Sequence, residues 1–120
     1  MASPMSQPVG PYTPIVRAGD LLVTSGQLGI GEDGLVEGGF APQLTQALAN
    51  LGRVVEGAGA TLGHVVKTTV FLTDMADFAE MNTIYCRFFG EHRPARSAVA
   101  VAALPLGALV EVEALLHSPP

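Results

Sequence analysis

The segment from Pro94 to Glu113 constrains the fold more than any other part of the chain. It consists of two apolar, alternating runs on either side of a turn that contains proline and glycine. This pattern predicts a β-hairpin or two closely spaced strands, because successive residues of a strand point to opposite faces. The first run then places Arg96 on one face with three alanines, and the second places Glu111 and Glu113 together on one face.

Arg96 has two interpretations at this point. A guanidinium on an apolar strand needs a partner, and its planar fork fits a carboxylate in a two-point contact. The carboxylate can belong to the chain itself, as a cross-strand ion pair between Arg96 and Glu113 on a half-exposed sheet. It can instead belong to a bound ligand. Paired charges are often only structural, so the residues alone leave both interpretations open.

Composition restricts the classes of partner. The chain has 120 residues, of which 48% are hydrophobic and 14% are charged. One domain of this length buries a real core. So few charges suggest that part of the apolar surface is covered by copies of the same chain. The net charge of −5 and the lack of a basic run disfavour a phosphate backbone as a partner, so no nucleic acid is expected.

The domain boundaries and the cellular setting follow from local composition. We expect a loose leader over residues 1–9, a single domain over 10–117 and a frayed tail over 118–120. The single cysteine, Cys86, can form no internal disulfide, which predicts a reducing, cytoplasmic setting. The sequence has no signal-peptide pattern and no apolar run of the roughly 20 residues that span a membrane. No membrane contact is expected.

Hydrophobic periodicity predicts the element order β-β-α-β-α-β-β. A hairpin is expected over residues 15–27, a strand over 65–72, and helices over 40–57 and 75–89. Two amphipathic helices and so few strands favour an α+β fold with both helices on one face of a mixed sheet. The glycine-rich stretch 29–39 lacks the lysine and the following helix of a phosphate-binding loop, and is predicted to be flexible.

Four polar or small residues outside this segment have structural interpretations of their own. Tyr12 is expected to cap the core with its ring, and Ser25 and Gly26 to form a turn at a strand end. Asn82 lies off the centre of the apolar stripe of the second helix, where it is predicted to face solvent. Taken alone, none of the four requires a chemical role.

Short motifs follow one another along nearly the whole chain, from Gly10 to about Leu116. They are Gly10-Pro11-Tyr12, Thr24-Ser25-Gly26-Gln27, Val66-Lys67-Thr68-Thr69-Val70-Phe71, Met81-Asn82 with Tyr85 and Phe88-Phe89, Pro94-Ala95-Arg96-Ser97, and Glu111-Val112-Glu113-Ala114. No one motif is decisive, but in their order and spacing the chain resembles the Rid (YjgF-type) family of enamine/imine deaminases. The resemblance implies a chorismate-mutase-like homotrimer, in which three sheets pack into a central barrel and the sites lie between subunits.

The resemblance also implies a reaction. Members of the family hydrolyse reactive 2-enamine and 2-imine acids, such as 2-aminoacrylate, to 2-keto acids and ammonia without a metal or cofactor. By position, Arg96 is expected to hold the substrate carboxylate, and Glu113 to orient and deprotonate the attacking water. The implied pocket residues are Tyr12, Ser25, the Gly26 amide, Asn82 and the backbone of Ala98.

Three departures from the family's usual pattern bear on the substrate. Ala98 stands where cysteine is frequent, Ala100 stands where glutamate is common, and the loop 91–93 is shorter than in many relatives. Two other functions therefore stand beside the deaminase. One is non-catalytic binding of small carboxylates, as in a metabolite sensor. The other is RNA cleavage or translation inhibition, ascribed to some relatives and disfavoured by the acidic balance.

Overall fold

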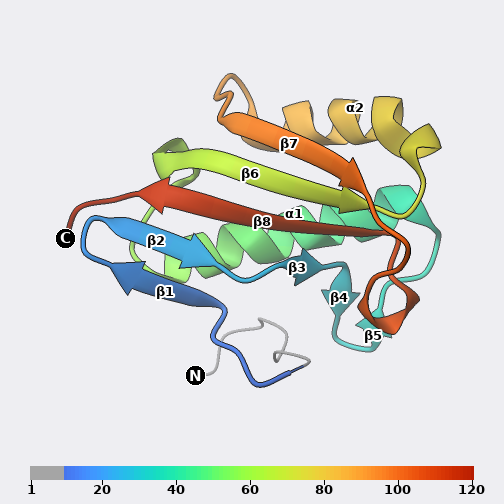
Figure 1. Ribbon diagram of the computed structural model, residues 1–120, viewed down its shortest axis with the longest axis horizontal. Coiled ribbons are helices and arrows are strands. Elements are labelled where there is room, and N and C mark those ends of the chain that lie inside the picture. The colour runs from blue at the N-terminus through green and yellow to red at the C-terminus, as the bar shows by residue number, and fades with distance from the viewer. Residues whose placement is uncertain (1–9) are drawn as a thin grey trace.

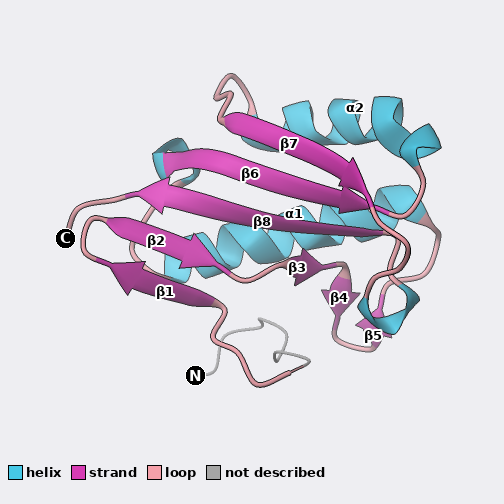
Figure 2. Cartoon of the chain, viewed as in Figure 1, coloured by secondary structure: helices cyan, strands magenta, loops and turns pink. Residues whose placement is uncertain are grey.

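The computed structural model describes residues 10–120, so the leader expected over residues 1–9 lies outside the described part. A six-stranded sheet runs in the order β1-β2-β8-β6-β7, with β3 also beside β8. Helices α1 and α2 lie on one side of it (Figures 1 and 2). The bounds are β1 Ile15–Ala18, β2 Leu21–Thr24, β3 Gln27–Leu28, β4 Ile30–Gly31, β5 Gly34–Leu35, α1 Phe40–Gly57, β6 Val65–Leu72, α2 Phe78–Phe89, β7 Ala95–Ala100 and β8 Val110–His117, with 3-10 turns η1 Leu62–His64, η2 Met75–Asp77 and η3 Pro105–Gly107.

The hairpin predicted from Pro94 to Glu113 is wrong, because β6 lies between β7 and β8. Strand β7 returns from α2 and pairs parallel with β6, as a strand does after a helical crossover. The connection through η3 then carries the chain to the other edge of β6, where β8 pairs antiparallel. Alternation predicts that each segment is a strand, but it does not determine which strand is the neighbour.

The same register excludes the predicted Arg96–Glu113 ion pair. Arg96 is aligned with Thr68, which is fully buried under the helices. Glu113 is aligned with Thr69, the next residue along β6. Since consecutive residues of a strand point to opposite faces, the guanidinium lies on the helix side of the sheet and the carboxylate on the other side.

The core lies between the sheet and the helices. Every second residue of β8, and of β6 from Thr68 onward, is buried there, and the predicted apolar stripe of α1 packs onto them. Fully buried members include Leu44, Leu48, Leu51, Val55, Val70, Leu72, Val110, Val112 and Leu116. Helix α2 adds Met81, Tyr85 and Phe89, as its stripe predicts. The Tyr85 hydroxyl lies 2.7 Å from that of Thr68, so two buried polar groups satisfy each other.

The opposite face of the sheet, here called the open face, is apolar and exposed in the single chain. It carries Val16, Leu21, Val23 and Val99, whose side chains are between 39% and 52% exposed. Both helices lie on the other face, as predicted. Four large apolar side chains on one face are typical of a surface that another molecule covers. This face fits the expected self-association, which remains a prediction.

Two segments are more ordered than their composition predicts. The glycine-rich stretch 29–39 contains the short strands β4 and β5, because its small residues let the chain lie directly on α1. A Cβ added to Gly29 would come 2.5 Å from the backbone oxygen of Gln43. The tail predicted to fray is held at Ser118, which is buried and accepts a hydrogen bond of 2.6 Å from Nη1 of Arg17.

Candidate functional site

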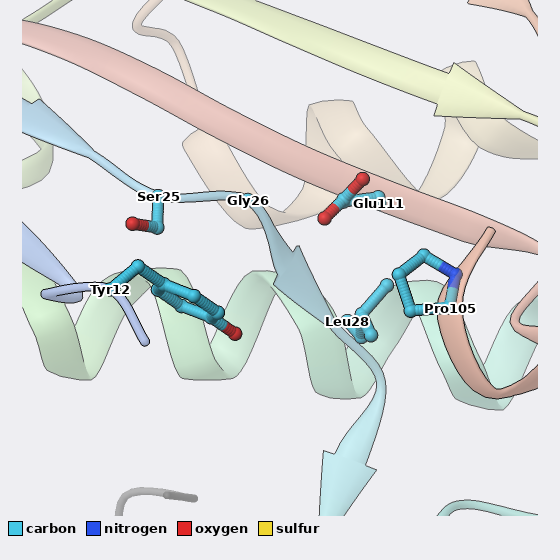
Figure 3. Close-up of a pocket in the computed structure, with 6 residues that line it drawn as sticks. All are labelled: Tyr12, Ser25, Gly26, Leu28, Pro105 and Glu111. Atoms are coloured by element: carbon cyan, nitrogen blue, oxygen red, sulfur yellow. The ribbon is translucent and has the colours of Figure 1, made fainter. Parts of the chain in front are cut away.

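A hollow of about 230 Å³ lies beside β8, next to the junction between β2 and β3. Four parts of the chain meet there: the segment ahead of β1, the β2–β3 junction, η3 and β8 (Figure 3). The lining residues are Tyr12, Ser25, Gly26, Leu28, Pro105 and Glu111. Three residues predicted for the pocket, Tyr12, Ser25 and Gly26, are therefore brought together. We call this hollow the Glu111 pocket.

Strand pairing and close packing fix the Glu111 carboxylate. In the register between β3 and β8, Leu28 is the partner of Glu111. Figure 3 shows the Glu111 side chain reaching from β8 toward Gly26. A Cβ added at Gly26 would come 2.3 Å from Oε2 of Glu111, so only glycine allows this approach. The turn predicted at Ser25 and Gly26 is thus the wall against which the carboxylate packs.

The electrostatic environment makes Glu111 a stronger base than an ordinary glutamate. Burial raises the pKa of its carboxyl above the usual value, and the negative charge of Glu113 raises this pKa further. Glu113 lies two residues along the same face of β8, so the two carboxylates share one side of the strand. Glu111 therefore takes up a proton at a higher pH than an exposed glutamate does.

The side chains of Tyr12 and Ser25 complete one side of the pocket. The Ser25 hydroxyl donates a hydrogen bond of 2.6 Å to the backbone oxygen of Thr13, and its amide donates one of 2.8 Å to the oxygen of Pro14. These two bonds hold the segment that carries Tyr12 against the end of β2. The Tyr12 side chain is 41% exposed and lines the hollow, so it does not cap the core as predicted.

Arg96 is the centre of a second cluster on the helix side of β7, here called the Arg96 surface. Its Nη1 donates a hydrogen bond of 2.8 Å to Oδ1 of Asn82. Its guanidinium carbon lies 5.0 Å from the ring centroid of Tyr85 and 5.6 Å from that of Phe78. Within residues 10–120 no carboxylate forms an ion pair with it. The remaining N–H donors of the fork are therefore available to an anion.

Asn82 and Ala98 belong to the Arg96 surface. Asn82 is half-buried against Arg96, so the prediction that it faces solvent is wrong. Ala98 follows Arg96 by two residues on β7 and is half-buried on the same face. The arginine thus has a fixed orientation, which one amide and two aromatic rings set.

The predicted site residues therefore fall into two groups that a single chain does not bring together. Tyr12, Ser25 and Gly26 surround Glu111, whereas Asn82 and Ala98 accompany Arg96. Glu111 is aligned with Phe71 on the open side of β6, and Arg96 is aligned with Thr68 on the helix side. The residue that the sequence prediction missed is Glu111. The sequence shows that Glu111 and Glu113 share one face of the strand. Only the register, in which Leu28 of β3 is aligned with Glu111, shows which of the two carboxylates lines the hollow.

Metal-binding groups and membrane-spanning helices are both absent from the described residues. Residues 10–120 contain no group of three or more His, Cys, Asp and Glu side chains arranged to hold a metal ion. Neither helix in this range is long and apolar enough to cross a membrane.

Comparisons with known proteins cover almost the entire chain. A family model described as endoribonuclease L-PSP matches residues 3–117. A RutC family protein of Pyrococcus horikoshii is 44% identical over 115 residues, which are 92% of this chain and 90% of that protein. The 2-iminobutanoate/2-iminopropanoate deaminase of Escherichia coli is 44% identical over 111 residues, 89% of this chain and 87% of its own. The crystal structure of RidA from an Antarctic Psychrobacter bacterium has a TM-score of 0.92 at 40% identity, and the match covers 98% of this chain and 96% of that one.

Proposed function

Because this chain belongs to the Rid (YjgF/RidA) family, we propose that it hydrolyses small 2-enamine and 2-imine acids to 2-keto acids and ammonia. The observation that carries the proposal is the pair of functional groups on the two clusters. Arg96 is an oriented guanidinium with no carboxylate partner within residues 10–120, and Glu111 is a half-buried carboxylate in a hollow. An imine acid needs both an anchor for its carboxylate and a base for the attacking water.

The complete site is proposed to form between two subunits of a homotrimer. The two clusters lie on opposite faces of one chain, so a substrate cannot contact both within that chain. Covering the apolar open face with a neighbouring sheet would bury Val23 and Val99. Such packing brings the Arg96 surface of one subunit to the Glu111 pocket of the next. This arrangement gives a single reason for the exposed apolar face and for the division of the site.

In this site the substrate carboxylate accepts two parallel hydrogen bonds from the fork of Arg96. Glu111 accepts a proton from a water molecule as its oxygen bonds to the imine carbon, and the C=N π electrons move to nitrogen. The proton held by Glu111 then passes to this nitrogen, which gives a neutral carbinolamine. Glu111 next takes the hydroxyl proton of the carbinolamine and returns it to the amine as the C–N bond breaks, so ammonia leaves and the oxygen forms the keto group. Imine and water thus give keto acid and ammonia. Positioning of the water and the substrate supplies most of the acceleration.

The sequence analysis gave the role of base to Glu113. We assign it instead to Glu111. Glu111 lines the hollow, whereas Glu113 acts on it through charge. Tyr12 and Ser25 shape one wall of the hollow, and Gly26 permits the approach of the carboxylate. Ala98 leaves room beside Arg96, where many relatives have a sulfur atom. The exposed thiol of Cys86 fits the reducing cytoplasm, which we propose as the location.

A coupled assay tests this function. A pyridoxal-phosphate lyase generates 2-aminoacrylate or its four-carbon analogue, and the appearance of keto acid is followed with and without the protein. Wild type is expected to accelerate the reaction and Arg96→Ala to abolish the acceleration, while the melting temperature stays close to that of wild type. Arg96→Lys keeps the charge without the fork, so an intermediate rate is expected.

Two results would redirect the proposal. If wild type binds small carboxylates but accelerates no imine tested, the site is a non-catalytic binding site. RNA cleavage by the pure protein that survives Arg96→Ala would favour the ribonuclease named in the family description. The net charge of −5 gives that activity no electrostatic support.

A further inference from the structure

Helix α1 supports the Glu111 pocket from behind through two buried amide side chains. Gln43 and Asn50 are 5% and 3% exposed, and they lie seven residues apart, about two helical turns, on one side of the helix. A buried polar side chain in a helix is costly unless it is hydrogen-bonded. Each of these two amides is bonded to a different wall of the pocket.

Asn50 uses its full hydrogen-bonding capacity. Its Nδ2 donates to the backbone oxygens of Leu28 at 3.0 Å and Ile30 at 2.9 Å. Its Oδ1 accepts from Nε2 of Gln46 at 2.8 Å and from Nη2 of Arg53 at 2.6 Å. An Asn has two amide donors and two acceptor lone pairs, so all four are occupied. A fully satisfied buried amide fixes its partners in one arrangement.

The two strand carbonyls held by Asn50 belong to the segment that packs against Glu111. Leu28 is the strand partner of Glu111, and Gly26 lies two residues earlier, in contact with the carboxylate. Between the two carbonyls, the backbone at Gly29 lies directly on that of Gln43. The position of β3 relative to the carboxylate is therefore determined from the helix side.

Gln43 holds the other wall. Its Oε1 accepts a hydrogen bond of 2.8 Å from the backbone amide of Leu109, two residues before Glu111. One helix thus fixes β3 through Asn50 and the start of β8 through Gln43. The separation between the Gly26 wall and the Glu111 carboxylate is set by two side chains that do not line the pocket.

We propose that Asn50 is a positioning residue that holds β3, and with it Gly26 and Leu28, against the carboxylate of Glu111. Its catalytic consequence rests on the proposed deaminase function, whereas its structural consequence does not. Without the two bonds from Nδ2, β3 would move away from β8 and water would reach Glu111. The carboxylate would then lose the orientation and the burial that make it an effective base.

The titration of Glu111 reports this burial without requiring activity. Glu113 on β8 and Tyr12 ahead of β1 are the titratable groups that face it. Among residues 10–120, the segment 26–28 and η3 line the pocket with uncharged residues, namely Gly26, Leu28 and Pro105, and the partner of Glu111 on β6 is the uncharged Phe71. The charged residue on this face of β6, Lys67, is aligned with Leu115, four residues along β8 from Glu111, and donates a hydrogen bond to Ser97. Neither Glu113 nor Tyr12 is bonded to Asn50 through any of the four contacts above. A change in the Glu111 titration on substitution of Asn50 therefore reflects the move of β3.

The deciding experiment compares Asn50→Ala and Asn50→Asp with wild type and with Val55→Ala. Val55 is a fully buried core residue on the same helix, so its truncation lowers stability without touching β3. Carboxyl resonances of ¹³C-labelled glutamate give the Glu111 titration, and the coupled assay gives kcat and KM. Asn50→Asp keeps the size of the side chain and both acceptor contacts, and it replaces the two donated bonds with a carboxylate oxygen that faces the same two carbonyls. Because this variant also adds a negative charge, the Glu111 titration is read in Asn50→Ala.

In both Asn50 variants kcat is expected to fall roughly ten- to a hundred-fold, and in Asn50→Ala the Glu111 titration is expected to move to lower pH. Val55→Ala is expected to lower the melting temperature while both readouts stay at wild-type values. If the Asn50 variants lower only the melting temperature, the positioning role is wrong. If wild type turns over no imine, the deaminase proposal fails, and the Glu111 titration in Asn50→Ala still decides the positioning role.

Discussion

The Glu111 pocket and the Arg96 surface hold their key charges in different ways. The carboxylate is packed against a glycine, paired with β3 and supported from behind by α1. The guanidinium has one hydrogen bond and two aromatic rings, and the rest of its fork is free for an anion. The fold thus preorganises the proposed base and leaves the proposed anchor accessible. A group that acts on water needs a fixed, partly dry setting, whereas a group that captures a substrate needs an open one.

Val23→Asp is expected to produce the largest effect, because it prevents the assembly that brings the Arg96 surface of one subunit to the Glu111 pocket of the next. An aspartate on the apolar open face would have to be buried without a partner in any sheet-to-sheet interface. Sedimentation at low micromolar concentration is expected to give a trimer for wild type and a monomer for the variant, and the deaminase activity is expected to disappear. Thr83→Asp, at an exposed position on α2, is the matched control and is expected to change neither.

A monomeric wild type would contradict both the trimer and the site between subunits. A monomeric Val23→Asp that keeps full activity would show that one chain completes the site by itself. Either result would remove the explanation given for the division of the site residues.

Mixed trimers sharpen the comparison between the two clusters. Arg96→Ala and Glu111→Gln are each expected to be inactive, and each retains the group that the other lacks. If one site takes its arginine and its glutamate from different chains, an equimolar co-refolded mixture regains about a quarter of the wild-type activity, because one site in four receives both groups. The rate is measured before and after refolding the mixture. No recovery in verified mixed trimers would place both groups in the same chain.

Glu113→Gln is expected to have the smallest effect, a shift of the pH profile. Removing the Glu113 charge lowers the pKa of Glu111, because that charge is one of the two causes that raise it. The base acts in its deprotonated form, so kcat/KM falls as the pH falls through this pKa. In the variant the loss should occur at lower pH, with the same rate at high pH. A collapse of the high-pH rate would instead make Glu113 the base.

Much of the fold is predictable from local pattern. The buried stripes of α1 and α2, the strand predicted from the β-branched run of β6 and the alternation of β8 are confirmed, because each is a property of residues close in sequence. The neighbour relations were not predictable. Strands β7 and β8 follow each other along the chain, but β6 separates them, since pairing depends on a crossover through α2. Because the sequence does not show this strand order, Arg96 and Glu113 were predicted to lie on adjacent strands.

The site was predictable to the same extent. The motifs singled out Arg96, Tyr12, Ser25 and Gly26, whose roles remain predictions, whereas the proposal of Glu111 over Glu113 required the register of a two-residue strand. Asn50 and Gln43 gave no signal at all. In the sequence they are two polar residues on an amphipathic helix, and such residues usually face solvent. Only the chain packed across that side of α1 shows that both are buried.

The last strand of the chain occupies an interior position in its sheet. Strand β8 lies between β2 and β6, which have no contact of their own in the strand order, so the sheet is continuous only through residues 110–117 (Figure 1). During synthesis the earlier strands of this sheet can form only two separate pieces, β1 with β2 and β6 with β7, each with a bare edge. The strand that joins them is the strand that carries Glu111. A prematurely terminated chain therefore lacks the proposed base and the continuous sheet together, so no truncated product can retain the proposed anchor, Arg96, within a complete fold.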